Sequence, residues 1–516
     1  MRLQTRRVAL AAGAASTIVA LSANAALADR PGTTTATGPT TTVRPYVLPV
    51  ADGVSTTSLF TVGDRPAGNG YRMVGIPDGL GVLDAGKQTV DVLMNQELSA
   101  TQGLSRAHGR PGAFVSRLTL DRKTGAVLAG EDLIRRVNFW RYADGGYGPT
   151  PQPPAGSTQP PQFSRFCSGA LTEPGQLLNR RTGNGYDGQL YFANEEAGDD
   201  GRAFAVETDG TATQLPRLGL FSWENTLAAA NRSDTTLIMG NEDGGSGQLR
   251  VYRGTKTGTG SAVERAGLTN GVLSVIDLVD EAVSTDAQFR ATYGTGTPAP
   301  VDLAEIDWNA SGSAQNAQAA AAGLTLNRIE DGAFDPRHPN DYYFHTTEGG
   351  DTTPNPELPG VPRDGGGLWR LSFTDIEHPE LGGTLTLLLD GSEAPYLNKP
   401  DNMTIDEHGN LLIQEDPGGN DSLARIVAYR ISDGALAVLA QFDPARFAPA
   451  AKGRPGFLTI DEESSGIVDV SRTMNSPRTF LFDAQVHLPH PDPELVEHGQ
   501  LLTLTVANWN RVYGGR

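Results

Sequence analysis

One pattern recurs along most of the chain, and it constrains the fold more than any other feature. A short β-rich run ends in a carboxylate, a Gly-rich turn follows, and a second β-rich run comes after the turn. The copies end at Glu97, Glu195–Glu196, Glu242–Asp243, Glu348 and Glu415–Asp416, with a weaker sixth that ends on Gln485 and His487. About six strand-rich repeats of unequal length predict an all-β fold, a six-bladed β-propeller.

A second short element lies upstream of five of these copies. Its segments read CSGAL, ENTLA, EDGAFD, DNMTID and SSGIVD, and they begin at Cys167, Glu224, Glu330, Asp401 and Ser464. The innermost strand of each propeller blade lines a central channel, so equivalent positions on successive blades form a ring. We therefore expect this column of side chains at one mouth of the channel. The sixth counterpart, residues 71–83, offers no residue that resembles a ligand.

Carboxylates gathered in this way repel one another. Two unit charges 4 Å apart interact by about 4 kcal/mol at an effective dielectric constant of about 20. Bound multivalent cations are the natural compensation, whereas carboxylates on the blade rims would simply face water. Oxygen ligands suit calcium, and one thiolate among them suits a transition metal such as iron. The candidate ligands are Glu97, Cys167, Glu195, Glu224, Glu242, Glu330, Asp401 and Glu415.

Composition supports a globular, turn-rich chain and argues against some partners. Of the 516 residues, 62 are Gly and 34 are Pro, which favours many turns and short strands. Hydrophobic residues make up 38% of the chain, enough to bury a sizeable core. The formal net charge of −19 disfavours nucleic acid and anionic membrane surfaces as partners. Cys167 is the single cysteine, so no intrachain disulfide can form, and we expect a monomer.

The first 28 residues are typical of a signal peptide. Arg2, Arg6 and Arg7 precede a mostly apolar stretch, and residues 26–28 (ALA) form a small-x-small cleavage site. Residues 5–10 (TRRVAL) resemble a twin-arginine signal, with the general secretory route as the alternative. We therefore expect a secreted or periplasmic protein that has no membrane segment after the signal is removed. The alternative is that the same stretch stays as an N-terminal membrane anchor.

Three further segments define the expected domain organisation. Residues 29–45 are rich in Thr, Gly and Pro and predict a flexible linker. Residues 46–516 are expected to form the propeller domain. Within it, residues 254–325 interrupt the strand pattern with apolar residues at three- and four-residue spacing and a run of Ala. This change of period predicts a partly helical insertion.

The order and number of the short motifs resemble the PhoX family of secreted alkaline phosphatases, from about Tyr71 to His487. The matching pieces are Asn95-Gln96-Glu97, Phe166-Cys167-Ser168, Glu195-Glu196, Phe221-Ser222-Trp223-Glu224, Glu242-Asp243, Arg328-Ile329-Glu330, Pro400-Asp401-Asn402 and Glu415-Asp416. The resemblance implies a six-bladed propeller with an iron–calcium cluster in the channel mouth, hydrolysing phosphate monoesters. The chain departs from the family pattern at Gln96 and Trp223, where the family usually has His. It also has Gln485-Val486-His487-Leu488 in place of Gln-His-Pro-Gly.

The resemblance also implies a role for each matched residue. Cys167 would ligate iron, and Arg328 would bind the phosphate of a small phosphorylated substrate. The carboxylates that would share the iron and calcium ions are Glu97, Glu195, Glu224, Glu242 and Glu330. Cys167, Arg328 and Glu330 are therefore the expected catalytic residues. The alternatives are a buried, unligated thiol at Cys167 and a structural ion pair between Arg328 and a neighbouring acid such as Glu330.

Two other functions stay open on the sequence alone. One is a calcium-dependent propeller hydrolase of another type, such as a phytase-like phosphoesterase or a lactonase. The other is a non-catalytic propeller that binds partners through its acidic face. Turnover of lactone or phytate without iron would favour the first, and metal binding without any turnover would favour the second.

Overall fold

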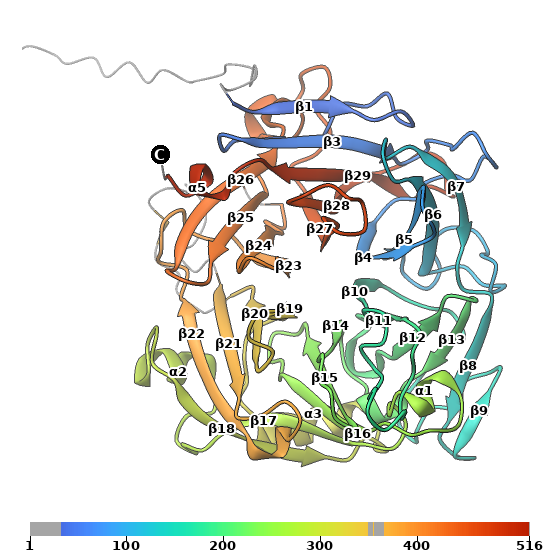
Figure 1. The fold of residues 1–516 in the computed structure, drawn as a ribbon, viewed down its shortest axis with the longest axis vertical. Coiled ribbons are helices and arrows are strands. Elements are labelled where there is room, and N and C mark those ends of the chain that lie inside the picture. The colour runs from blue at the N-terminus through green and yellow to red at the C-terminus, as the bar shows by residue number, and fades with distance from the viewer. Residues whose placement is uncertain (1–31, 349–353, 356–365, 420, 515–516) are drawn as a thin grey trace, which may run out of the picture.

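The computed structural model describes residues 32–348, 354–355, 366–419 and 421–514. The signal peptide expected over residues 1–28 lies outside the described residues. In the described part of the chain, β-sheets are arranged radially around a central axis (Figure 1). No helix within these ranges is both long enough and apolar enough to cross a membrane.

Six strands, one from each blade, surround the axis. These innermost strands are β4 (Pro77–Asp84), β10 (Phe166–Leu171), β14 (Trp223–Ala228), β19 (Ile329–Phe334), β23 (Pro400–Ile405) and β27 (Glu462–Asp469). Each contacts the next in this order, and β27 contacts β4, so the ring is closed. The prediction of an all-β, six-bladed propeller is confirmed.

Each blade continues outward from its innermost strand by antiparallel pairing. The second strands are β5 (Thr89–Gln96), β11 (Leu190–Glu195), β15 (Thr235–Glu242), β20 (Asp341–Thr346), β24 (Asn410–Glu415) and β28 (Thr479–Pro489). The third strands are β6 (Phe114–Asp121), β12 (Ala203–Glu207), β16 (Arg250–Thr255), β21 (Gly367–Phe373), β25 (Arg425–Arg430) and β29 (Glu497–Val506). The fourth strands are β7 (Val127–Asp132), β13 (Thr211–Gln214), β17 (Val272–Leu278), β22 (Gly383–Leu389), β26 (Ala435–Phe442) and β3 (Val54–Thr61).

The core lies between neighbouring blades. One cluster joins Leu93 and Val115 of the first blade to Tyr191 and Phe204 of the second, and all four side chains are buried. Side chains alternate between the two faces of a strand, so each blade packs one set against the blade before it and the other against the blade after it. Apolar burial on both faces holds the six blades in fixed positions around the axis.

The N-terminal part of the chain completes the last two blades. β3 pairs with the C-terminal strand β29 in the sixth blade, and β2 (Val47–Pro49) pairs with β26 in the fifth. β1 (Thr34–Thr37) then pairs in parallel with β3, its first partners being Thr34 and Ser55. The expectation of a flexible linker over residues 29–45 is therefore wrong for residues 34–37. β-branched Thr residues suit a strand, and they cover the edge that β3 would otherwise expose.

Residues 254–325 supply both helices and strands. Three helices lie in this segment, α1 (Ala262–Arg265), α2 (Asp286–Thr292) and α3 (Gly312–Ala322). The same segment contains β17, the fourth strand of the third blade, and β18 (Ala299–Ile306). β18 pairs with both β17 and β22, and this merges the third and fourth blades into one continuous sheet. The segment is therefore a structural part of two blades as well as an addition to them. A further hairpin, β8 (Arg136–Arg141) with β9 (Gly146–Gly148), extends the second blade at β13.

Candidate active site

A ring of six polar side chains surrounds one mouth of the channel. Its members occupy the second position of each innermost strand: Asp78, Cys167, Glu224, Glu330, Asp401 and Glu463. The strand register shifts across this position in five of the six blades, for example between Phe166 and Gly169 in β10, which flank Cys167. Such a β-bulge redirects the local side chains and is frequent beside functional sites. The bulges therefore help to direct one side chain from each blade into a common space.

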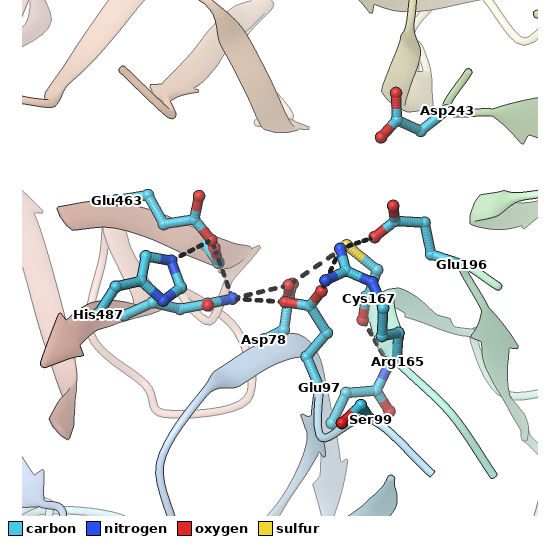
Figure 2. Close-up of polar contacts among 12 residues, drawn as sticks. Asp78, Glu97, Ser99, Arg165, Cys167, Glu196, Asp243, Glu463 and His487 are labelled. Atoms are coloured by element: carbon cyan, nitrogen blue, oxygen red, sulfur yellow. Dashed lines mark hydrogen bonds and ion pairs between the residues drawn. The ribbon is translucent and has the colours of Figure 1, made fainter. Parts of the chain in front are cut away.

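A second set of polar side chains follows the ends of the second strands. Glu97, Glu196, Asp243 and Asp416 come directly after β5, β11, β15 and β24. Together with five ring members, they line a cavity of about 390 Å³, and Asp78 lies within reach of Glu97 and Cys167. Figure 2 shows Glu97 of the first blade directed toward Cys167 and Glu196 of the second.

The ligand atoms in this cavity form four overlapping groups. In each group, three ligand atoms lie within 4.8 Å of one another. The groups are Asp78, Glu97 and Cys167; Cys167, Glu196 and Glu224; Glu224, Glu330 and Asp401; and Asp401, Asp416 and Glu463. Successive groups share Cys167, Glu224 or Asp401, so the donors form a connected chain around the cavity. This arrangement can hold several cations close together.

The structure corrects the predicted ligands Glu195, Glu242 and Glu415. Each is the last residue of its strand, is buried, and forms an ion pair with an arginine at or directly before the start of the adjacent strand. The pairs are Arg202–Glu195 at 2.5 Å, Arg250–Glu242 at 3.0 Å and Arg425–Glu415 at 2.6 Å. Successive side chains in an extended chain point to opposite sides, so the next residue, and not this one, faces the cavity. The cavity residues are therefore Glu196, Asp243 and Asp416. Six of the predicted site residues do line the cavity: Glu97, Cys167, Glu224, Arg328, Glu330 and Asp401.

Adjacent glutamates in the second blade provide a direct test of this difference. We expect Glu195→Gln to lower the free energy of unfolding by about 3 kcal/mol, because the Arg202 side chain, 1% exposed, would lose its buried charge partner. Glu196→Gln should cost less stability than Glu195→Gln, because Arg165 keeps Glu97 as a charge partner, but it should lower the metal content. Denaturant unfolding and elemental analysis of both variants check the pair. Equal metal loss in both variants would contradict the assignment.

Sequence reasoning missed two members of the ring. Asp78 is not among the predicted ligands. A signal for it exists, because Pro77-Asp78 repeats the pair Pro400-Asp401, and both prolines start an innermost strand. In the sixth blade the aligned column was placed on Ser464, whereas the side chain in the cavity is Glu463. The register of β27 shifts later than in the other blades, between Ser465 and Ile467, and this moves the equivalent position by one residue.

Burial and mutual repulsion raise the pKa values of these acids. Burial is the larger cause and neighbouring carboxylates the next, and together they raise the pKa well above the ordinary value for Asp78, Glu224, Glu330, Asp401 and Glu463. The same causes raise the pKa of Glu196 to about 8. Burial, followed by the charge of Asp78, also raises the pKa of the Cys167 thiol. With no cation bound, these groups would hold protons, and a bound cation would displace those protons.

Two arginines stand at the same cavity. Arg165 and Arg328 each lie directly before an innermost strand, with positive φ angles of 48° and 54°. Arg165 forms an ion pair with Glu97 at 2.7 Å and a second one with Glu196. Arg328 bonds to Asp243 at 2.8 Å and lies 3.3 Å from Glu330. The expected ion pair of Arg328 is thus present, but its side chain is still 35% exposed and lines the cavity, so it can also meet a ligand.

Amide side chains one strand away fix the backbone that carries the ring. Asn95 Nδ2 donates to the carbonyl oxygen of Cys167 at 2.7 Å, across the boundary between two blades. Asn241 Nδ2 donates in the same way to the carbonyl oxygen of Glu330. Both asparagines are fully buried, so each bond holds a ring member of the next blade in place.

The departures from the family pattern have different locations. Gln96 is fully buried and bonds to Ser116, away from the cavity. Trp223 is 1% exposed and stacks on Phe221, with ring centroids 3.9 Å apart. His487 does line the cavity, and its Nδ1 lies 2.8 Å from Glu497 Oε2. Only the third departure therefore changes a side chain that a substrate could meet.

Comparisons with known proteins agree with this geometry. A sequence model described as "Alkaline phosphatase PhoX" matches residues 181–452, just over half of the chain. PhoX of Pseudomonas fluorescens, solved in complex with vanadate, a transition state analogue, is 12% identical and superposes with a TM-score of 0.62. That likeness covers 90% of this chain and 99% of the other. A Lactobacillus plantarum protein, also 12% identical, covers 80% of this chain and 99% of its own, but its TM-score of 0.33 supports no argument. No curated protein matches the chain.

Proposed function

The chain belongs to the alkaline phosphatase PhoX family of phosphoric ester hydrolases, and from this premise we propose that it hydrolyses phosphate monoesters in the acidic cavity. One observation supports this most: Arg165 and Arg328 stand beside a connected chain of carboxylates and one thiol in a single cavity. Guanidinium groups bind phosphate oxygens, and the acids provide sites for cations. The substrate class we propose is therefore a small phosphorylated molecule.

We propose calcium and iron as the bound metals. The donors fit them, because carboxylate oxygens suit calcium and the Cys167 thiolate suits iron. A buried oxygen of Glu224, Oε1, has no hydrogen-bond partner among the described residues, as expected for an atom that ligates an ion. The residues that would hold the metals are Asp78, Glu97, Cys167, Glu196, Glu224, Glu330, Asp401, Asp416 and Glu463. When bound, such cations neutralise phosphate oxygens and lower the pKa of water.

The side chains of the chain itself would bind and orient the substrate. Arg328 is held by Asp243 and Glu330, and its planar group can make two parallel bonds to a phosphate. Arg165 is fixed by Glu97 and Glu196, so neither arginine needs to be reoriented before the reaction. His487 adds a donor at the cavity wall. Burial alone would lower the pKa of His487, but its bond to Glu497 raises it, which favours the protonated imidazole.

The proposal is tested with the full chain, purified and supplied with calcium and iron. We expect release of p-nitrophenol from p-nitrophenyl phosphate and little release from the bis(p-nitrophenyl) diester. Elemental analysis should find both metals in the same preparation. Inactivity toward a panel of phosphate monoesters and diesters, with both metals bound, would contradict the proposed function, and turnover of phytate or a lactone without iron would support the calcium-dependent alternative.

Arg328→Lys probes phosphate binding. Lysine keeps the charge but cannot make two parallel bonds, so we expect kcat/KM for p-nitrophenyl phosphate to fall by about 10²-fold. Steady-state kinetics at several substrate concentrations measure the change. Arg110→Lys, at an exposed position outside the cavity lining, is the matched control and should keep wild-type kinetics. Equal rates for wild type and Arg328→Lys would show that Arg328 serves only its ion pairs.

We also propose export through the signal in residues 1–28. The support is the sequence itself, in which Arg6 and Arg7 precede the apolar stretch and the cleavage site. Substitution of both arginines by lysine should keep the chain inside the cell if the twin-arginine route is used. Unchanged export of that variant, measured by fractionation, would favour the general secretory route.

A further inference from the structure

A second large cavity lies at the end of the propeller opposite the acidic one. Its volume is about 810 Å³. Apart from Glu377, which lies in the loop between β21 and β22, its lining comes from loops that join innermost strands to second strands. The acidic cavity lies at the other end, where innermost strands begin and second strands end. Arg180 and Arg181 come from the loop between β10 and β11, and Arg232 from the loop between β14 and β15. Three positively charged side chains from two blades therefore line one cavity, although the net charge of the chain is −19.

The three arginines are not engaged elsewhere. All three are exposed, and none makes an ion pair or a side-chain hydrogen bond with another residue in the described ranges. Two acids outside the lining lie near these loops: Asp187, which is exposed and close to Arg180 beside Gly175, and Asp234, which is committed to other donors. Asp234 accepts bonds from Asn179 at 2.7 Å, Thr182 at 2.7 Å and Asn184 at 3.1 Å.

A buried lysine adds positive charge behind the cavity wall. Lys256 is 2% exposed, and its Nζ donates to Asn231 Oδ1 and to the carbonyl oxygen of Ser233, both at 3.0 Å. Both partners are neutral. Burial lowers the pKa of Lys256 to about 8, so the ammonium form still predominates at pH 7. Glu377 is the one acid in the lining, and it accepts a bond from the backbone N–H of Arg232 at 3.3 Å. The four cations, three arginines and Lys256, thus still outnumber the acids Glu377, Asp234 and Asp187.

The remaining lining defines the class of ligand. Leu178, Ala230, Pro336 and Pro339 give the cavity an apolar wall beside its cationic one. A volume of about 810 Å³ is far larger than a single phosphate needs and is typical of sites for organic molecules. Guanidinium groups recognise phosphate and sulfate groups through paired bonds.

We propose that this cavity, centred on Arg180, Arg181 and Arg232, binds an organic polyanion of nucleotide size that carries two or more phosphate groups. The site is separate from the metal-lined cavity, so this inference does not rest on the proposed function. Binding should weaken as salt increases, because exposed charges are screened.

Inositol hexasulfate is a suitable probe, since a phosphatase does not hydrolyse sulfate esters. Isothermal titration calorimetry with the full-length, calcium-saturated protein at low ionic strength should show one binding event. We expect the triple variant Arg180→Gln, Arg181→Gln, Arg232→Gln to bind the probe about tenfold or more weakly, because it loses the charge-assisted hydrogen bonds of three arginines. Arg454→Gln, an exposed position outside both cavities, removes the same type of charge and should change the affinity less than about twofold.

Phosphatase activity of the triple variant serves as the folding control and should equal that of wild type. If the triple variant does not fold, the three single variants replace it, each with a smaller but measurable loss of affinity. Absence of binding to wild type, or equal binding by wild type and the variants, would overturn the proposal. Loss of binding on saturation with orthovanadate would also overturn it, because the probe would then occupy the acidic cavity.

Discussion

Replacement of Cys167 by alanine is expected to remove iron from the protein and to lower kcat/KM for p-nitrophenyl phosphate by at least about 10³-fold. The Cys167 side chain belongs to two of the four ligand groups, one with Asp78 and Glu97 and one with Glu196 and Glu224. Its loss therefore breaks the connected donor chain at a shared position. Cys167 is 8% exposed, and its Sγ lies 3.5 Å from Asp78 Oδ2, within the donor cluster.

The measurement is elemental analysis combined with steady-state kinetics on the same preparation. Ser168→Ala is the control, since Ser168 is the next residue in β10 but does not line the acidic cavity. It accepts a bond from Asn402, and its loss should reduce stability by about 1 kcal/mol while iron and activity remain. A Cys167→Ala variant that keeps both iron and activity would identify Cys167 as a buried thiol without a metal role.

Removal of calcium and iron by a chelator is expected to abolish activity and to make stability depend on pH. The ring carboxylates have pKa values above those of the unfolded chain because of burial and neighbouring charges. Between the unfolded and the folded pKa, the folded protein binds more protons, so the free energy of unfolding falls as pH rises. The metal-free protein should therefore lose stability from about pH 4, where unfolded carboxylates titrate, upward. Glu196, with a pKa of about 8, extends this loss to about pH 8.

Thermal unfolding at pH 5, 6, 7 and 8, with and without calcium, checks this expectation. Calcium at about 1,000 times its Kd should stabilise the folded protein by about 4 kcal/mol at each pH where the sites are filled. At one fixed calcium concentration the effect should grow from pH 5 to pH 8, because protons compete less with the metal as pH rises. A metal-free protein that becomes more stable from pH 5 to pH 8 would contradict the charge distribution described here.

The architecture could be predicted from the sequence because the repeated strand pattern shows how many blades the chain forms. Each copy contains an innermost and a second strand, and six such copies close into one ring whatever the loops between them. The location of four site residues could be predicted for the same reason, since equivalent positions in a closed ring face one axis. These residues are Cys167, Glu224, Glu330 and Asp401.

The errors have physical causes that a single sequence does not reveal. Glu195 and Glu196 are chemically identical, and only the phase of the strand decides which one faces the cavity. The partner Arg202 that holds Glu195 lies directly before the next strand, so the pairing appears only once the strand register is known. Asp78 stood outside the aligned column because its blade was the least similar copy. The pairing of residues 34–37 depends on the edge of β3, which composition alone cannot indicate.

The closure of the sixth blade has a consequence for how the protein matures. The blade that carries Glu463 receives β29 from the end of the chain and β3 from its beginning. The ribosome must translate the chain as far as Val506 before these two strands can meet. The acidic cavity can therefore assemble only after that point, and a chain that stops before β29 would lack the strand that closes the blade carrying Glu463.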